Sequence, residues 1–133
     1  MLKAGQFARL VGTALAMWLL ATLYIHWLPN VFVSQTRSAI GFVTTLPIAW
    51  LSVVAIRYIA RLTPQQLLVG VGVVGAIAMM VDGIVLRFLP QVYSQDPSVF
   101  RPASAWLLWG YGVSLAIAVA MSLRKLSPSP RDM

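Results

Sequence analysis

The sequence predicts an all-α integral membrane protein, a four-helix bundle that is built as two tandem helical hairpins. Of its 133 residues, 59% are hydrophobic and only 10% are charged, more apolar surface than a soluble domain of this size can bury. The chain contains four apolar runs of roughly 20 residues, and at about 1.5 Å per residue each crosses a hydrocarbon core about 30 Å thick. Basic residues gather at the ends of these runs, where topology signals lie.

The first hairpin contains predicted spans at residues 10–28 and 39–58. The first span follows the basic residues Lys3 and Arg9, and a basic start before an apolar run is also typical of a signal peptide. It is longer than a typical signal-peptide core and no small-residue cleavage site follows it, so we expect a retained helix. Pro47 lies near the middle of the second span and has no N–H to donate. It predicts a bend there, either a static kink or a hinge.

The second hairpin contains predicted spans at residues 66–89 and 103–123. Before the third span, the sequence Thr-Pro-Gln-Gln has the form of a capping box. In this motif Thr63 is the N-cap and the Gln66 side chain reaches back to the N–H of the cap. Pro102 occupies the position at which a proline is tolerated at the start of a helix, and it therefore marks the start of the fourth span.

The distribution of basic residues predicts the orientation of the four spans. Seven of the ten lysines and arginines fall on the side of the termini, and Arg37, Arg87 and Arg101 fall on the other. The seven are Lys3, Arg9, Arg57, Arg61, Arg124, Lys125 and Arg131. By the positive-inside rule we expect a multi-pass protein of the bacterial inner (cell) membrane with both termini cytoplasmic. Residues 124–133 are then a flexible cytoplasmic tail.

An internal repeat supports the two-hairpin arrangement. HWLPNVFVSQ at residues 26–35 resembles RFLPQVYSQ at residues 87–95 with one residue deleted. Both copies follow an odd-numbered span. The repeat therefore predicts two hairpins of about 60 residues with the same direction in the membrane, related by an axis along the membrane normal.

Small residues in the third and fourth spans predict close helix packing. Residues 70–75 match GxGxxG, but they lie inside an apolar span without a preceding strand, so dinucleotide binding is rejected. A better interpretation is that small residues form packing strips, which allow neighbouring helices to approach closely. The strip residues are Gly72, Gly75 and Ala78 in the third span, which share a helix face with Asp82, and Gly112 and Ala116 in the fourth.

Asp82 is the main candidate for a functional or packing site, because no other acid lies inside an apolar run. A carboxylate in hydrocarbon costs roughly 2.5–3.5 kcal/mol on insertion scales, so it needs partners. The candidate partners from neighbouring span ends are Tyr24, His26, Trp106 and Trp109. Arg87 lies on the same span, five residues on and about 140° around the helix, so it is a poor direct partner and is expected to extend outward. Three interpretations remain open: a hydrogen-bonding group between helices, a proton or cation site of a small transporter, and a docking point for a larger partner.

Composition argues against several other classes of function. The chain has no cysteine and one histidine, which supports neither a nucleophile with its base nor a metal site, so we expect no enzymatic activity, no metal and no cofactor. Topology signals account for the net charge of +7, so nucleic acid is not an expected partner. The expected partner is the lipid bilayer, with a homo-oligomer or a larger membrane protein as further possibilities. The aromatic residues Trp106, Trp109 and Tyr111 form either an interfacial belt or the lining of an organic-cation pocket.

The run VDGIVLRFLPQVYSQ followed by ASAWLLWGYGVSLAIA resembles an uncharacterised family of small four-helix bacterial membrane proteins. The resemblance rests on Asp82, Phe88, Pro90, Val92, Tyr93, Ala105 to Trp109 and Tyr111. It implies the architecture and no particular mechanism. We therefore expect a structural or accessory membrane subunit in which Asp82 fixes helix packing. The alternative is a small proton- or cation-coupled transporter that uses Asp82.

Overall fold

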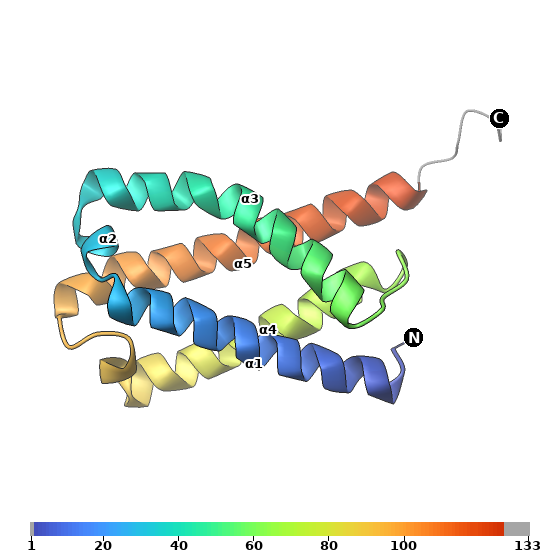
Figure 1. Cartoon of the computed structure of the whole chain (residues 1–133), viewed down its shortest axis with the longest axis horizontal. Helices are drawn as coiled ribbons and strands as arrows, with labels where there is room; N and C mark the ends of the chain where they lie inside the picture. The colour runs from blue at the N-terminus through green and yellow to red at the C-terminus, as the bar shows by residue number, and fades with distance from the viewer. Residues whose placement is uncertain (1, 127–133) are drawn as a thin grey trace.

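The computed structural model describes residues 2–126 and is an all-α bundle, as the sequence predicts. Four long helices form the bundle, and each is long and apolar enough to cross a membrane (Figure 1). Two short helical turns lie in the loops at one end. In chain order the elements are α1 (Ala4–Trp27), α2 (Asn30–Val33), α3 (Gln35–Ile59), α4 (Leu67–Phe88), η1 (Pro90–Val92) and α5 (Pro97–Leu126).

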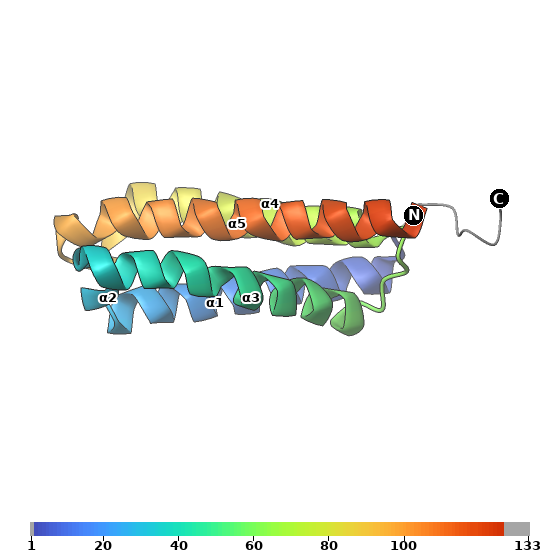
Figure 2. The same cartoon turned by 90° about the horizontal axis from the view of Figure 1, so that it is seen from above.

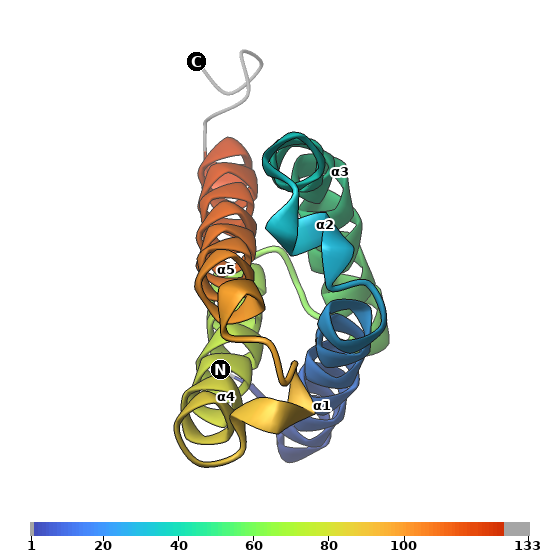
Figure 3. The ribbon, with the colours of Figure 1, turned by 90° about the vertical axis from the view of Figure 1, so that its left-hand side faces the viewer.

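The two hairpins pack face to face as two layers. One layer contains α1, α2 and α3, and the other contains α4 and α5 (Figure 2). Viewed from the end of the bundle, α1 lies beside α4 and α3 lies beside α5 (Figure 3). A two-fold axis along the bundle would place each helix diagonally opposite its counterpart. The predicted symmetry axis is therefore wrong, although the division into two hairpins of the same direction is correct.

The repeated sequence folds into the same local structure twice. Leu28 ends α1 with φ −124° and ψ 51°, and Leu89 ends α4 with φ −134° and ψ 50°. Each leucine is followed by a proline and a short helical turn. That turn brings an aromatic side chain back into the bundle, Phe32 in the first copy and Tyr93 in the second, and both are buried.

Helix α5 begins earlier than predicted because the loop before it supplies a cap. The Asp96 carboxylate accepts a hydrogen bond from the backbone N–H of Ser98 at 2.9 Å and one from its hydroxyl at 2.8 Å. These bonds favour the ionised form and lower the pKa of the exposed Asp96 carboxyl. Pro97 occupies the first helical position, where a missing N–H is harmless. Pro102 therefore lies inside the helix and not at its start.

The turn between α3 and α4 contains one half of the predicted capping box, but the N-cap of α4 is Gln66 and not Thr63. The Gln66 side chain accepts a hydrogen bond from the backbone N–H of Thr63 at 3.0 Å, as the capping box requires. Residues 64–66 form a turn, and the α-helix begins at Leu67. Arg61 has a φ of 53°, the left-handed conformation with which a chain commonly leaves a helix.

Helix α3 continues through Pro47 from Gln35 to Ile59 and bends along its length (Figure 1). The hydroxyls of Thr44 and Thr45 both donate to the carbonyl of Gly41, at 3.1 and 2.7 Å. They therefore bond one turn back along their own helix.

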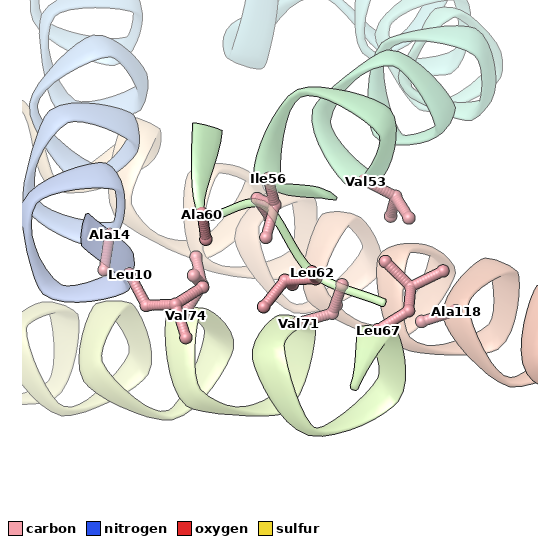
Figure 4. Packing of buried hydrophobic residues seen from close by; sticks show 10 residues of the cluster. All are labelled: Leu10, Ala14, Val53, Ile56, Ala60, Leu62, Leu67, Val71, Val74 and Ala118. Atoms are coloured by element: carbon pink, nitrogen blue, oxygen red, sulfur yellow. The ribbon is translucent and has the colours of Figure 1, made fainter. Parts of the chain in front are cut away.

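The core consists of two apolar clusters, one near each end of the bundle. Figure 4 shows the cluster nearer the termini, where side chains from α1, α3, α4 and α5 converge around the α3–α4 turn. The other cluster lies under the two loops and contains Ile25, Phe32, Val85, Tyr93, Val99, Ala103 and Leu107. Between the two clusters the bundle is not fully packed, and this leaves the cavity described below.

The packed face of α4 differs from the predicted strip. Its buried residues are Leu67, Gly70, Val71, Val74, Ala78, Asp82 and Val85. Gly70 is the glycine at a close approach, because a Cβ added there would collide with the Leu62 side chain. Gly72 is two residues on, about 200° around the helix, and a Cβ there would have no neighbour within 4 Å. Of the predicted strip, Ala78 is buried and Gly75 borders the cavity.

The strip predicted on α5 is also not a packing face within this chain. Gly112 and Ala116 are both exposed, and a Cβ added at Gly112 meets nothing within 4 Å. The buried residue of this segment is Ala118, which packs in the cluster near the termini. Small residues therefore occur on both the packed and the exposed face of α5, and their spacing alone does not tell which face is packed.

Candidate functional site at Asp82

Asp82 is buried, with 5% of its surface exposed, and both of its carboxylate oxygens are hydrogen-bonded. The hydroxyl of Tyr93 donates to Oδ1, and the hydroxyl of Tyr111 donates to Oδ2. The indole N–H of Trp18 donates to the Tyr93 hydroxyl at 3.1 Å. The network therefore connects α1, α4, α5 and the loop that follows η1.

The chemistry of this network suits a carboxylate held away from water. An ionised carboxylate only accepts hydrogen bonds, and each tyrosine hydroxyl supplies a donor. A hydrogen bond to a charged group contributes about 1.5–3 kcal/mol, so two of them offset an insertion cost of roughly 2.5–3.5 kcal/mol. Among the side chains of residues 2–124, no basic group forms an ion pair with Asp82, so the tyrosines provide the stabilisation.

Tyr93 is positioned for this role by the loop after α4. Its side chain is 1% exposed, because η1 turns the chain back over the end of the helix. Burial and the hydrogen bond to Asp82 raise the pKa of the Tyr93 hydroxyl above its ordinary value. The hydroxyl therefore remains a donor over the whole neutral range. Tyr93 also accepts from Trp18, so it connects α1 to the carboxylate.

Two of the predicted partners, Tyr24 and Trp106, form an aromatic cluster with Phe32 instead. The ring centroids of Tyr24 and Trp106 are 5.2 Å apart, and those of Phe32 and Trp106 are 5.7 Å apart. The indole N–H of Trp106 donates to the Thr45 hydroxyl at 2.9 Å. The polar atom of Trp106 is thus directed to α3 and not to Asp82.

Trp109 likewise joins α5 to α3. Its indole N–H donates to the carbonyl of Phe42 at 2.9 Å, and the two rings stack with centroids 5.6 Å apart. Tyr111 lies two residues after Trp109, about 200° around the helix, and five after Trp106, about 140°. One helix cannot direct all three side chains to the same carboxylate, and Tyr111 is the one that faces Asp82.

His26 and Arg87, the remaining candidate site residues, are exposed at the ends of their helices. The Arg87 guanidinium lies 5.6 Å from the centroid of the Phe88 ring, a cation–π contact. The prediction that Tyr24, His26, Trp106 and Trp109 gather around Asp82 is therefore wrong, because the hydrogen bonds to the carboxylate come from Tyr93 and Tyr111. Arg87 is exposed, as its position on the same helix predicted.

Sequence reasoning missed three members of the network, Trp18, Tyr93 and Tyr111, the last of which was expected only in an aromatic belt or a pocket lining. A signal for Tyr93 was present, because the repeat aligns it with Phe32 and so marks a position at which both copies place an aromatic residue. Trp18 lies four residues before the buried Thr22 and seven before the buried Ile25, so it shares their helix face. Neither signal identifies the residues that Tyr93 and Trp18 contact.

A cavity of about 370 Å³ lies between the two core clusters, with walls from all four long helices. The rings of Trp18, Trp106 and Tyr111 border it, together with Tyr24, whereas Trp109 does not. Asp82 is not among the described residues that line the cavity; the Tyr111 side chain connects the two. Part of the predicted aromatic group thus does line a pocket.

Neither a search for metal-binding groups nor a comparison with known proteins assigns a function to this site. Within residues 2–126 no group of three or more His, Cys, Asp or Glu side chains is placed to hold a metal ion. Comparison with protein-family models, curated proteins and solved structures finds no match to the chain. The resemblance to an uncharacterised membrane-protein family therefore stays a prediction.

Proposed function

We propose that this chain is a structural or accessory subunit of the bacterial inner membrane in which Asp82 fixes the packing of three helices. The observation that supports it is that tyrosine hydroxyls occupy both carboxylate oxygens. A carboxylate with both oxygens engaged and no place on a cavity wall acts as a fixed connection between helices. Removing it leaves the hydroxyls of Tyr93 and Tyr111 without their acceptor.

The exterior of the bundle supports the membrane location. Large apolar side chains along all four long helices are exposed, among them Leu20, Ile48, Ile84 and Leu108. Helices without a water-facing polar side pack by van der Waals contacts and leave their apolar surface to lipid. The start of α1 and the end of α5 lie at the same end of the bundle (Figure 1). With seven basic residues on that side against three, both termini are cytoplasmic in this proposal.

A second candidate is a small proton- or cation-coupled transporter, which the cavity favours. Tyr111 both borders the cavity and donates to Asp82, so a change at the carboxylate would reach the cavity wall. Transporter sites commonly combine an intramembrane acid with a cavity near the middle of the membrane.

The substitution Asp82→Asn separates the two functions, with Asp96→Asn as the control at an exposed carboxylate. Under the structural function, Asp82→Asn lowers the free energy of unfolding in detergent by about 1–3 kcal/mol, because one carboxylate oxygen is replaced by a donor. Proteoliposomes of the wild type then show no proton or cation flux that depends on Asp82. Flux that is lost in Asp82→Asn while the unfolding free energy stays unchanged would establish the transporter function instead.

A pull-down from mild detergent tests the accessory role. We expect the wild type to retain either a second copy or a larger membrane protein, and Asp82→Asn to retain less of it. A strictly monomeric protein with no co-purifying partner would contradict the accessory role while leaving the structural role of Asp82 in place.

A further inference from the structure

The cavity between the four helices opens sideways. Its exposed lining residues all belong to α1 and α3, and they include Leu20, Thr44 and Ile48. Leu20 is 67% exposed and Ile48 is 56% exposed, whereas the lining residues of α4 and α5 are buried or half-buried. The mouth therefore lies between α1 and α3, part-way along two helices that are long and apolar enough to span the bilayer. It faces lipid.

The serine and threonine hydroxyl groups in the cavity wall are already used within their own helices. The Ser52 hydroxyl donates to the carbonyl of Ile48 at 2.9 Å, and the Ser114 hydroxyl donates to that of Gly110 at 2.8 Å. Thr44 and Thr45 both donate to Gly41. The wall consequently offers an occupant aliphatic and aromatic surface and few free donors, which suits a hydrocarbon chain.

A second, smaller cavity of about 210 Å³ extends this groove towards the loop end of the bundle. It shares Tyr24, Gly41 and Thr44 with the first cavity and adds Arg37. Arg37 is exposed, and within residues 2–126 no carboxylate forms an ion pair with it. The two described acids are engaged elsewhere, Asp82 with tyrosines and Asp96 with Ser98. The groove thus ends at the Arg37 guanidinium, which has no carboxylate partner among the described residues.

The length of the groove matches one leaflet of a bilayer. Arg37, Gly41, Thr44 and Ile48 follow one another at three or four residues, so they share a face of α3. Eleven residues separate Arg37 from Ile48, which is about 16 Å along the helix. Half of a hydrocarbon core about 30 Å thick is about 15 Å. A lipid with its headgroup beside Arg37 therefore reaches the depth of the cavity with one acyl chain.

We propose that this groove binds an anionic phospholipid of the surrounding bilayer. Its phosphate pairs with the Arg37 guanidinium, and one acyl chain passes between α1 and α3 into the central cavity. A bilayer lipid fits better than a soluble ligand because the mouth opens to the membrane and not to water. The cavity shares Trp18 and Tyr111 with the Asp82 network, but the proposed headgroup contact at Arg37 lies outside that network.

The headgroup contact is tested by native mass spectrometry on protein released from vesicles of equimolar phosphatidylglycerol and phosphatidylcholine. We expect the wild type to retain one phospholipid with a preference for phosphatidylglycerol. Arg37→Gln should reduce this preference by about fivefold, which corresponds to about 1 kcal/mol for a basic residue at an anionic surface. Arg101→Gln is the matched control, since Arg101 is an exposed cation at the same end and lies outside both cavities.

The chain contact is tested by filling the groove where the two cavities meet. Thr44→Phe places a ring at the junction and should abolish lipid retention, whereas Val43→Phe places it on the neighbouring exposed residue outside both cavities and should not. Both positions are exposed, and circular dichroism and thermal unfolding verify that the variants are folded. Equal retention of both lipids by the wild type would overturn the proposal. So would equal loss in Arg37→Gln and Arg101→Gln, or displacement of the phospholipid by added oleate.

Discussion

Phe32 and Tyr93 occupy equivalent positions in the two repeated loops, and only Tyr93 carries a hydroxyl, which donates to Asp82. Both side chains are buried, at 4% and 1% exposed. Phe32 packs against the rings of Tyr24 and Trp106. The repeat places Leu28 and Leu89 at the same point, 61 residues apart, so the counterpart of Asp82 is Ala21. The acid and the hydroxyl are thus present together in the second hairpin and absent together from the first.

This pairing predicts strong coupling between Asp82 and Tyr93 in a double-mutant cycle. Asp82→Ala leaves the hydroxyls of Tyr93 and Tyr111 without their acceptor, and Tyr93→Phe leaves one carboxylate oxygen and the Trp18 indole unpaired. We expect the double variant to be more stable than the sum of the single effects predicts, by about 0.5–3 kcal/mol. The measurement is the free energy of unfolding in detergent for the four proteins of the cycle. Additive effects would show that the two side chains act independently.

The raised pKa of Tyr93 predicts a loss of stability in alkali. Below about pH 10 the hydroxyl is protonated in both the folded and the unfolded protein, so its contribution is fully present. Above about pH 10 the unfolded chain releases a proton that folded Tyr93 retains, and the free energy of unfolding falls as the pH rises. Above about pH 10, the free energy of unfolding of the wild type should therefore fall more steeply with pH than that of Tyr93→Phe. Tyr58→Phe, at a residue that is 77% exposed, should follow the wild type.

Two glycines on α4 test which face of this helix is packed. Gly70→Ala forces the end of the buried Leu62 side chain to move and should therefore lower the free energy of unfolding relative to Gly72→Ala. Gly72→Ala meets open space and should be neutral or stabilise the helix by up to about 1 kcal/mol. Thermal unfolding of both variants makes the comparison, and in a Leu62→Ala background Gly70→Ala should no longer cost stability. If Gly72→Ala were the less stable of the two variants, the packed face of α4 would be the one that the sequence predicted.

Topology is tested by reporter fusions after Met133 and within the loop of residues 91–101. Four spans place these two points on opposite sides of the membrane, because only α5 separates them. We expect the C-terminal fusion to report the cytoplasm and the loop fusion to report the other side. Reporters that give the same side for both points would rule out the four-span arrangement.

The sequence predicted the loops better than the packing faces. The repeat, the hydrogen bond from Thr63 to the Gln66 side chain and the ends of the first and third spans near residues 28 and 89 all depend on residues close in the chain, and the structure contains each of them. Gly72 failed as a packing residue because small side chains occur on more than one face of α4. Trp106 and Trp109 failed as partners of Asp82 because the sequence does not give the rotation of α5 about its axis relative to α4.

Sequence alone determined that the chain forms four apolar helices in two hairpins and that one of them carries a carboxylate near its loop end. Those properties follow from composition, length and local capping, which act over a few residues. Only the tertiary structure decided that Tyr93 and Tyr111, 11 and 29 residues away, hydrogen-bond to Asp82. It also decided that the bundle is open between α1 and α3. The rotation of each helix about its axis sets both features, and that rotation is fixed by side chains that meet from distant parts of the chain.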